Sequence, residues 1–134
     1  MQPHNTNIIM IKTIILVGLG GGLGSICRYL TSFLLNKYFQ STFPIGTFVV
    51  NIVGCLLIGL ILGLFERQYL SNPQLNFLLI TGFCGGYTTF SAFSAENIHL
   101  FQSGHTLTAF LYIGASIFIG LLAMWLGLNI CKWY

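Results

Sequence analysis

The sequence predicts an all-α integral membrane protein with four transmembrane helices, and three observations support this prediction. Of the 134 residues, 55% are hydrophobic and 5% are charged, whereas soluble domains carry roughly 25% charged residues. The mean hydropathy is +0.85. Four apolar stretches, at residues 13–35, 45–66, 75–98 and 106–130, each exceed the roughly 20 helical residues that cross a bilayer. A water-soluble fold is excluded because the chain has too few polar residues to cover its surface.

The first span is expected to follow a polar N-terminal tail, residues 1–12, within a single transmembrane domain of residues 1–134. Lys12 precedes an apolar run that continues to Leu35, and this run lacks the small-residue cleavage site of a secretory signal. Small residues spaced four apart let helices approach closely in lipid. The glycine pairs with this spacing are Gly18/Gly22, Gly20/Gly24, Gly59/Gly63 and Gly82/Gly86.

Short polar connections separate the four spans, which predicts that neighbouring spans are antiparallel. Lysine and arginine favour the cytoplasmic side of a membrane. Lys12, Arg67 and Lys132 fall on one side, while Lys37, with Arg28 near the same end of the first span, falls on the other. Because three against two is a weak bias, the chain could insert in both orientations, and two opposed copies could pair as an antiparallel, dual-topology dimer.

Several polar residues lie inside the predicted spans, where they are costly unless they face protein or water. Arg28 is either a cation that reaches toward the interface or part of a water-filled mouth, shared with Glu96 at the same end of the third span. Thr47 and Asn51 share one face of the second span, where an interhelical hydrogen bond is the alternative to a functional role. Tyr112 and Ser116 form a weakly polar stripe on the fourth span.

The third span has a composition that predicts a broken helix. Gly85-Gly86 is followed by Thr88-Thr89, which makes a poor helix at mid-membrane depth. Backbone groups exposed by such a break must face protein, an ion or water, and broken helices recur at ion sites. Phe90 and Phe93 follow the break at helical spacing. Ordinary packing is the alternative explanation for two phenylalanines placed in this way.

These motifs resemble the bacterial fluoride channel family, over essentially the whole chain beyond residue 10. The resemblance rests on the glycines of residues 20–24 with Arg28-Tyr29, on Gly46-Thr47 with Asn51 and Gly54, and above all on residues 82–94 with Glu96. Ala92 departs from the family pattern, because a threonine commonly stands there, and this removes one hydroxyl.

The resemblance implies a passive fluoride channel of the bacterial inner (plasma) membrane, a multi-pass protein that relieves cytoplasmic fluoride toxicity. It implies a dual-topology homodimer, with a related second chain as the alternative partner. Phe90, Phe93 and Asn51 would line each pore, and Thr47, Ser94, Tyr112 and Ser116 would extend a polar track. Arg28 would sit in an aqueous vestibule, to which Glu96 is also assigned, and the backbone carbonyls of Gly85 and Thr88 would hold a structural sodium ion.

Other functions fit the sequence less well. The residues form no catalytic constellation, so an enzyme is not expected, and a net charge of +3 is too small to indicate nucleic-acid binding. The four cysteines include no CxxC pair. A small multidrug exporter would need a membrane-embedded carboxylate, usually in the first span, but the acids are Glu66 and Glu96. A non-transporting assembly subunit would explain the apolar composition but not the third span.

Overall fold

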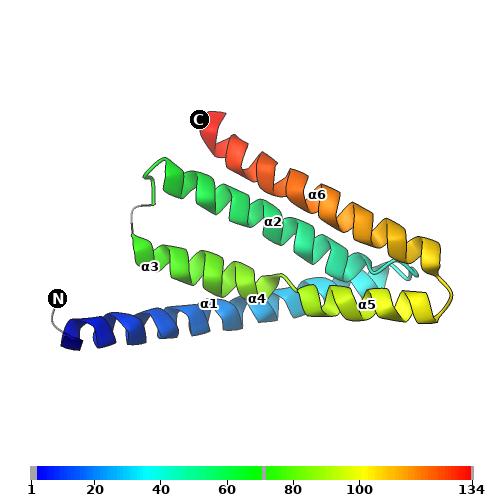
Figure 1. The fold of residues 1–134 in the computed structure, drawn as a ribbon, viewed down its shortest axis with the longest axis horizontal. Coiled ribbons are helices and arrows are strands. Elements are labelled where there is room, and N and C mark those ends of the chain that lie inside the picture. The colour runs from blue at the N-terminus through cyan, green and yellow to red at the C-terminus, as the bar shows by residue number, and fades with distance from the viewer. Residues whose placement is uncertain (1–2, 71, 134) are drawn as a thin grey trace.

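The computed structural model describes the backbone of residues 3–70 and 72–133 and the side chains of residues 7–70 and 72–131. This part of the chain is all-helical, which confirms the predicted class. Three of its helices are long and apolar enough to cross a membrane: α1 (Pro3–Tyr38), α2 (Ile45–Glu66) and α6 (Thr106–Trp133). α1 runs in one direction and α2 and α6 both run in the opposite direction, so that the start of α1 and the end of α6 lie at the same end of the molecule (Figure 1).

The first helix begins well before the predicted span. Residues 3–12, expected as a polar tail, continue α1, and residues 1–2 lie outside the described part. With 36 residues, α1 is about 54 Å long at 1.5 Å per residue. Its N-terminal end extends past the neighbouring helices (Figure 1). Ile8, Ile9, Met10 and Ile11 explain the continuation, since nothing in this stretch stops a helix.

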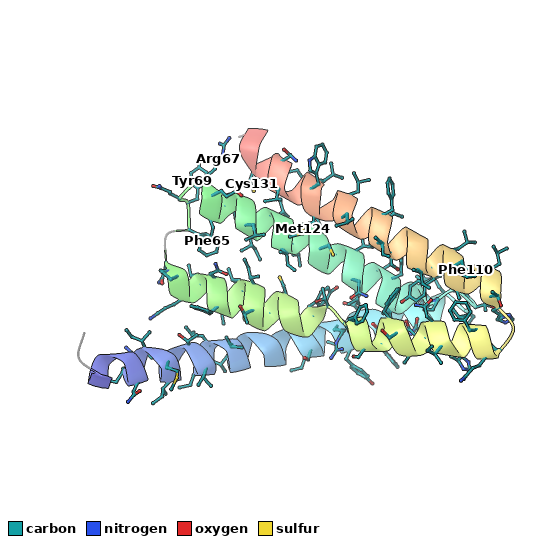
Figure 2. All side chains as sticks on the ribbon, viewed as in Figure 1. Phe65, Arg67, Tyr69, Phe110, Met124 and Cys131 are labelled. Atoms are coloured by element: carbon teal, nitrogen blue, oxygen red, sulfur yellow. The ribbon has the colours of Figure 1, made fainter. Side chains whose placement is uncertain are left out.

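Helices α2 and α6 form the most extensive helix pair in the fold. Glycines allow the two backbones to touch: a Cβ on Gly59 would collide with the Met124 carbonyl, and one on Gly127 with the Leu56 carbonyl. Figure 2 shows Met124 beside α2, with Cys131 near Arg67 at one end of the pair and Phe110 at the other. The two helices are therefore in close backbone contact.

The predicted third span is divided among four short elements. In order they are α3 (Pro73–Asn76), the π-helix η1 (Phe77–Cys84), α4 (Gly85–Tyr87) and α5 (Phe90–Gln102). Asn72 caps α3, accepting a hydrogen bond from the Gln74 amide at 2.9 Å. The π-helix packs on α1, where a Cβ on Gly20 or Gly24 would collide with backbone atoms of residues 78–87.

A small aromatic core lies at the end of the molecule opposite the two termini, where α5, α6 and the loop before α2 meet (Figure 1). Leu100, Ala109 and Tyr112 are buried there, and Phe43, Phe48 and Phe93 pack against them. Most other large apolar side chains of α1 and α6 are exposed. Exposure of this extent is ordinary for helices whose surroundings are lipid rather than water.

Candidate pore site

The candidate site is built around the junction of α4 and α5. Thr88 is extended, with φ −79° and ψ 158°, and so is Thr89, with φ −150° and ψ 115°. Thr89 begins α5 as its N-cap, because its hydroxyl accepts a hydrogen bond from the Ala92 amide at 3.3 Å. Two extended residues between helices interrupt the regular hydrogen bonding, so their backbone groups need other partners.

Asn51, on α2, supplies those partners for Thr89. Its Oδ1 accepts a hydrogen bond from the Thr89 amide at 2.8 Å, and its Nδ2 donates one to the Thr89 carbonyl at 3.2 Å. Thr89 is 8% exposed, so water offers little alternative. A side-chain amide has two N–H groups, and this arrangement leaves one of them available.

The junction also frees two backbone carbonyls. In a continuous α-helix the Thr89 amide would bond to the Gly85 carbonyl, and the Ala92 amide to the Thr88 carbonyl. Here the first amide bonds to Asn51 and the second to the Thr89 hydroxyl. The carbonyl oxygens of Gly85 and Thr88 therefore lack their regular helical donors. Gly85 is exposed on the surface of the chain.

Four of the predicted pore residues line one hollow of about 170 Å³. Asn51, Phe90, Phe93 and Ser116 share it with Ile117. The Ser116 hydroxyl oxygen is buried and has no hydrogen-bond partner among the described residues. The hollow thus combines a free hydroxyl, a spare amide N–H and two aromatic rings 5.7 Å apart.

A second hollow, of about 230 Å³, adjoins the first, since Asn51 and Phe90 line both. Cys55, Ile58, Thr88 and Thr89 complete it. The two hollows together follow the α4–α5 junction, with Asn51 and Phe90 between them.

Glu96 gathers two other predicted residues. The Thr47 hydroxyl donates to its Oε1 at 2.6 Å, and the Tyr112 hydroxyl donates to its Oε2 at 2.8 Å. The Tyr112 ring also contacts Phe93, with centroids 5.0 Å apart, so this group adjoins the first hollow. Arg28 is half-buried, and Glu96 forms these hydrogen bonds rather than an ion pair with Arg28.

Ser94 does not line the first hollow, although it lies one turn from Phe90. Sequence reasoning missed the role of Thr89, for which a threonine preceding a helical run is the N-cap signal. It also missed Phe43, whose ring centroid lies 5.1 Å from that of Tyr112. Nothing in the sequence around Phe43 signals this contact.

Comparison with known proteins places the chain among relatives. Residues 15–128 match the family described as CrcB-like protein, Camphor Resistance (CrcB). The chain belongs to the CrcB family. A relative from Flavobacterium psychrophilum is 63% identical over 121 residues, which cover 90% of this chain and 98% of the relative. One from Azobacteroides pseudotrichonymphae is 43% identical over 125 residues, covering 93% and 100%. Both relatives carry the name fluoride-specific ion channel FluC.

Membership in the CrcB family confirms the resemblance seen in the sequence motifs. The relatives are named as ion channels, a class of protein that is not enzymatic. Together with three helices able to span a bilayer, family membership supports the predicted multi-pass location in the bacterial inner membrane. The family match covers every predicted site residue, from Arg28 to Ser116.

Proposed function

We propose that this chain forms a fluoride-selective channel that lets the anion leave the cytoplasm passively and so relieves fluoride toxicity. The relatives are named for this activity. The observation that carries the proposal is the hollow lined by Asn51, Phe90, Phe93 and Ser116, which offers unused donors and aromatic rings in a narrow, largely apolar space. Because the cell interior is electrically negative, an anion is driven outward through such a pore without an energy source.

The lining suits a small, strongly hydrated anion. Entering the hollow costs the anion its water, and the Ser116 hydroxyl and the spare Asn51 N–H can each replace one water donor. The rings of Phe90 and Phe93 present positive edges to an anion. Chloride is larger and gains less from close donors, so a narrow lining of this kind favours fluoride.

The pore requires a second surface, and we assign it to another copy of the chain in the opposite orientation. Phe90 is 78% exposed although it lines both hollows. A hydrophobic ring in that position cannot enclose an anion unless another surface covers it. An antiparallel homodimer, or a pair with a related second chain, supplies that cover and is in keeping with the weak charge bias between the two sides.

A structural sodium ion fits the carbonyls freed at the α4–α5 junction. Unwound carbonyls of this kind coordinate sodium in membrane proteins. The oxygens of Gly85 and Thr88 lack their helical donors, and Gly85 is exposed where a second copy could add its own pair. When bound, the cation would offset the repulsion between anions. The described residues also hold the junction themselves, through Asn51 and Thr89. On this proposal α3, η1, α4 and α5 act together as one broken third span.

Glu96 and Arg28 are assigned to the mouths of the pathway. The hydroxyls of Thr47 and Tyr112 each have one proton, and both donate it to Glu96. These hydroxyls can therefore donate to a passing anion only when their hydrogen bonds to the carboxylate break. Ser94 extends the polar track on the face of α5 that continues from Phe90. Arg28 supplies positive charge that attracts anions to the entrance.

Ion efflux from liposomes tests the proposed function directly. Purified protein is reconstituted with internal fluoride or chloride, and the loss of each anion is followed with an ion-selective electrode. Fast fluoride loss with chloride retained is the expected result. If folded protein released neither anion, the channel assignment would be wrong, and a non-transporting membrane subunit would take its place.

Substitution of the two phenylalanines tests the assigned pore. Phe90→Ile and Phe93→Ile each keep an apolar side chain but remove an aromatic ring that lines the hollow. We expect each variant to lose fluoride efflux while its elution on size-exclusion chromatography stays unchanged. Ile117→Val is the matched control, because Ile117 lines the same hollow without a donor or a ring. Normal efflux from both phenylalanine variants would contradict the assigned lining.

A further inference from the structure

The contact between Asn51 and Thr89 carries an inference beyond anion binding. Thr89 has both of its backbone groups bonded to one side chain from another helix. In lipid, an unpaired backbone group costs several kcal/mol, so the α4–α5 junction depends on whatever satisfies it. An amide side chain offers a neutral acceptor and a neutral donor side by side. Aspartate or serine at this position would lack one of the two or misplace it.

Thr89 in turn sets the start of α5. Its hydroxyl caps the Ala92 amide at 3.3 Å and lies 3.1 Å from the Ser91 hydroxyl. The next residue, Phe90, is the first of α5, and Phe93 follows one turn later. The position of Thr89 therefore determines where both rings point. Asn51 is attached to α2, which is packed along its length against α6.

We infer that Asn51 is a positioning residue, which acts through Thr89 to hold the α4–α5 junction extended and thereby to place Phe90 and Phe93. The oxygen of its side chain supports this role, because an oxygen acceptor repels an anion and contributes nothing to binding it. One N–H bonds to Thr89, and only the second is left to donate to an anion in the hollow. The inference rests on the proposed channel function for its consequence. The two hydrogen bonds between Asn51 and Thr89, the Asn51 clamp, are present in the chain without any anion.

Spectroscopy in fluoride-free buffer separates positioning from anion binding. Phe93 is replaced site-specifically by 4-fluorophenylalanine, and the ¹⁹F spectrum of reconstituted protein is recorded for the parent and for Asn51→Ser. Hydrogen exchange at the Thr89 amide is measured in parallel. We expect the variant to show a shifted or split resonance and an exchange rate about tenfold higher, since one buried hydrogen bond is lost.

Ser116→Ala is the matched control. Ser116 lines the same hollow, but its hydroxyl has no partner among the described residues. Its loss should slow fluoride efflux and leave both the ¹⁹F resonance and the Thr89 exchange rate as in the parent. Asn51→Asp is a second variant, which keeps an oxygen for the Thr89 amide but faces the Thr89 carbonyl with another oxygen. Here the amide should stay protected while the Phe93 resonance moves.

The inference is overturned if Asn51→Ser and Asn51→Asp give the parental spectrum and parental exchange, even when efflux is lost. That result would leave Asn51 as an anion ligand alone. If instead the parent protein carries no fluoride, the proposed function fails, yet the fluoride-free spectra still decide whether the clamp exists. The two failures are therefore distinguishable in one set of samples.

Discussion

Glycines on α2 and α6 differ sharply from those on the open face of α1. A Cβ at Gly59 would collide with the Met124 carbonyl oxygen, and one at Gly127 would collide with that of Leu56. Gly18 and Gly22 also stand four residues apart, but a Cβ at either would meet nothing within 4 Å. The first set completes a contact within the chain. The second set has the spacing of a close helix contact, but no helix among the described residues packs against it.

This difference separates the helix faces that are packed against another helix of the same chain from a helix face that is not. One face of α1 packs closely against η1 and α4, where the glycines are Gly20 and Gly24 on α1 and Gly86 on α4. This face of α1 is therefore already in contact within the chain. The opposite face exposes Ile15, Leu19 and Ile26 beside its unused glycines. Large side chains there would serve equally well against lipid, so glycine at two of the positions favours contact with a second helix. The antiparallel dimer we propose would supply one.

The largest expected effect comes from disrupting the contact between α2 and α6. Gly59→Ala places a methyl group against backbone that cannot move aside, since Met124 belongs to the middle of α6. We expect a loss of about 3 kcal/mol in the free energy of unfolding, the upper range for overpacking. Denaturation in detergent, followed by circular dichroism, measures it.

Gly120→Ala provides the control for that loss on the same helix pair. Its Cβ would lie 3.6 Å from the Cys55 sulfur, an ordinary van der Waals contact. The stability of this variant should match the parent or rise slightly, because alanine is the better helix former. Equal stability of Gly59→Ala and Gly120→Ala would mean that α2 and α6 are not in backbone contact.

Gly22→Leu tests whether the Gly18/Gly22 face of α1 contacts a second copy of the chain. Within one chain a Cβ at this position would meet nothing within 4 Å, so the helical content and the fold of the chain should be kept. Against a second copy it would separate the two helices, and we expect the dimer to give way to monomer. Chemical cross-linking at fixed protein-to-lipid ratio measures the change, and fluoride efflux should fall with it.

Gly114→Leu is the matched control for the dimer. Gly114 also has open space around it, but the residues four positions away are Phe110 and Phe118, so it belongs to no small-residue pair. This variant should remain dimeric. Dimer retained by Gly22→Leu as well would remove the α1 face from the interface.

The sequence predicts the helices of this chain better than their contacts. The span predicted at 45–66 coincides with α2, since Pro44 and Glu66 mark its ends. The π-helix at 77–84 was not predicted, because a short, mostly apolar run has no periodicity that separates one helix type from another. The early start of α1 was missed because polar residues were given more weight than the isoleucines among them.

The same limit applies to the site. The motif around Thr88-Thr89 and Phe90 places the residues of the junction along the chain, and the 3.6-residue period places Thr47 and Asn51 on one face of α2. Which atoms meet across helices depends on how each helix is rotated, and the sequence does not encode this locally. The sequence therefore left open whether Glu96 contacts Arg28, and in the structure the hydrogen bonds of Glu96 go to Thr47 and Tyr112.

The smallest expected effect concerns that hydrogen-bonded group, which joins α2, α5 and α6. Tyr112→Phe keeps the ring contacts with Phe43 and Phe93 but removes the 2.8 Å hydrogen bond to Glu96. A hydrogen bond to a charged acceptor contributes about 1.5–3 kcal/mol. We expect a loss at the lower end of this range, below that of Gly59→Ala, because Thr47 still bonds to the carboxylate.

Thr47→Val and the double variant complete this test as a double-mutant cycle. Each hydroxyl donates to a different oxygen of Glu96, so the first deletion leaves the carboxylate one neutral donor and the second leaves it none. The double variant should therefore lose more stability than the sum of the two single variants. Strict additivity would mean that the two hydroxyls act independently. Glu96 would then be held in place by its own helix rather than by the hydrogen bonds that connect α5 to α2 and α6.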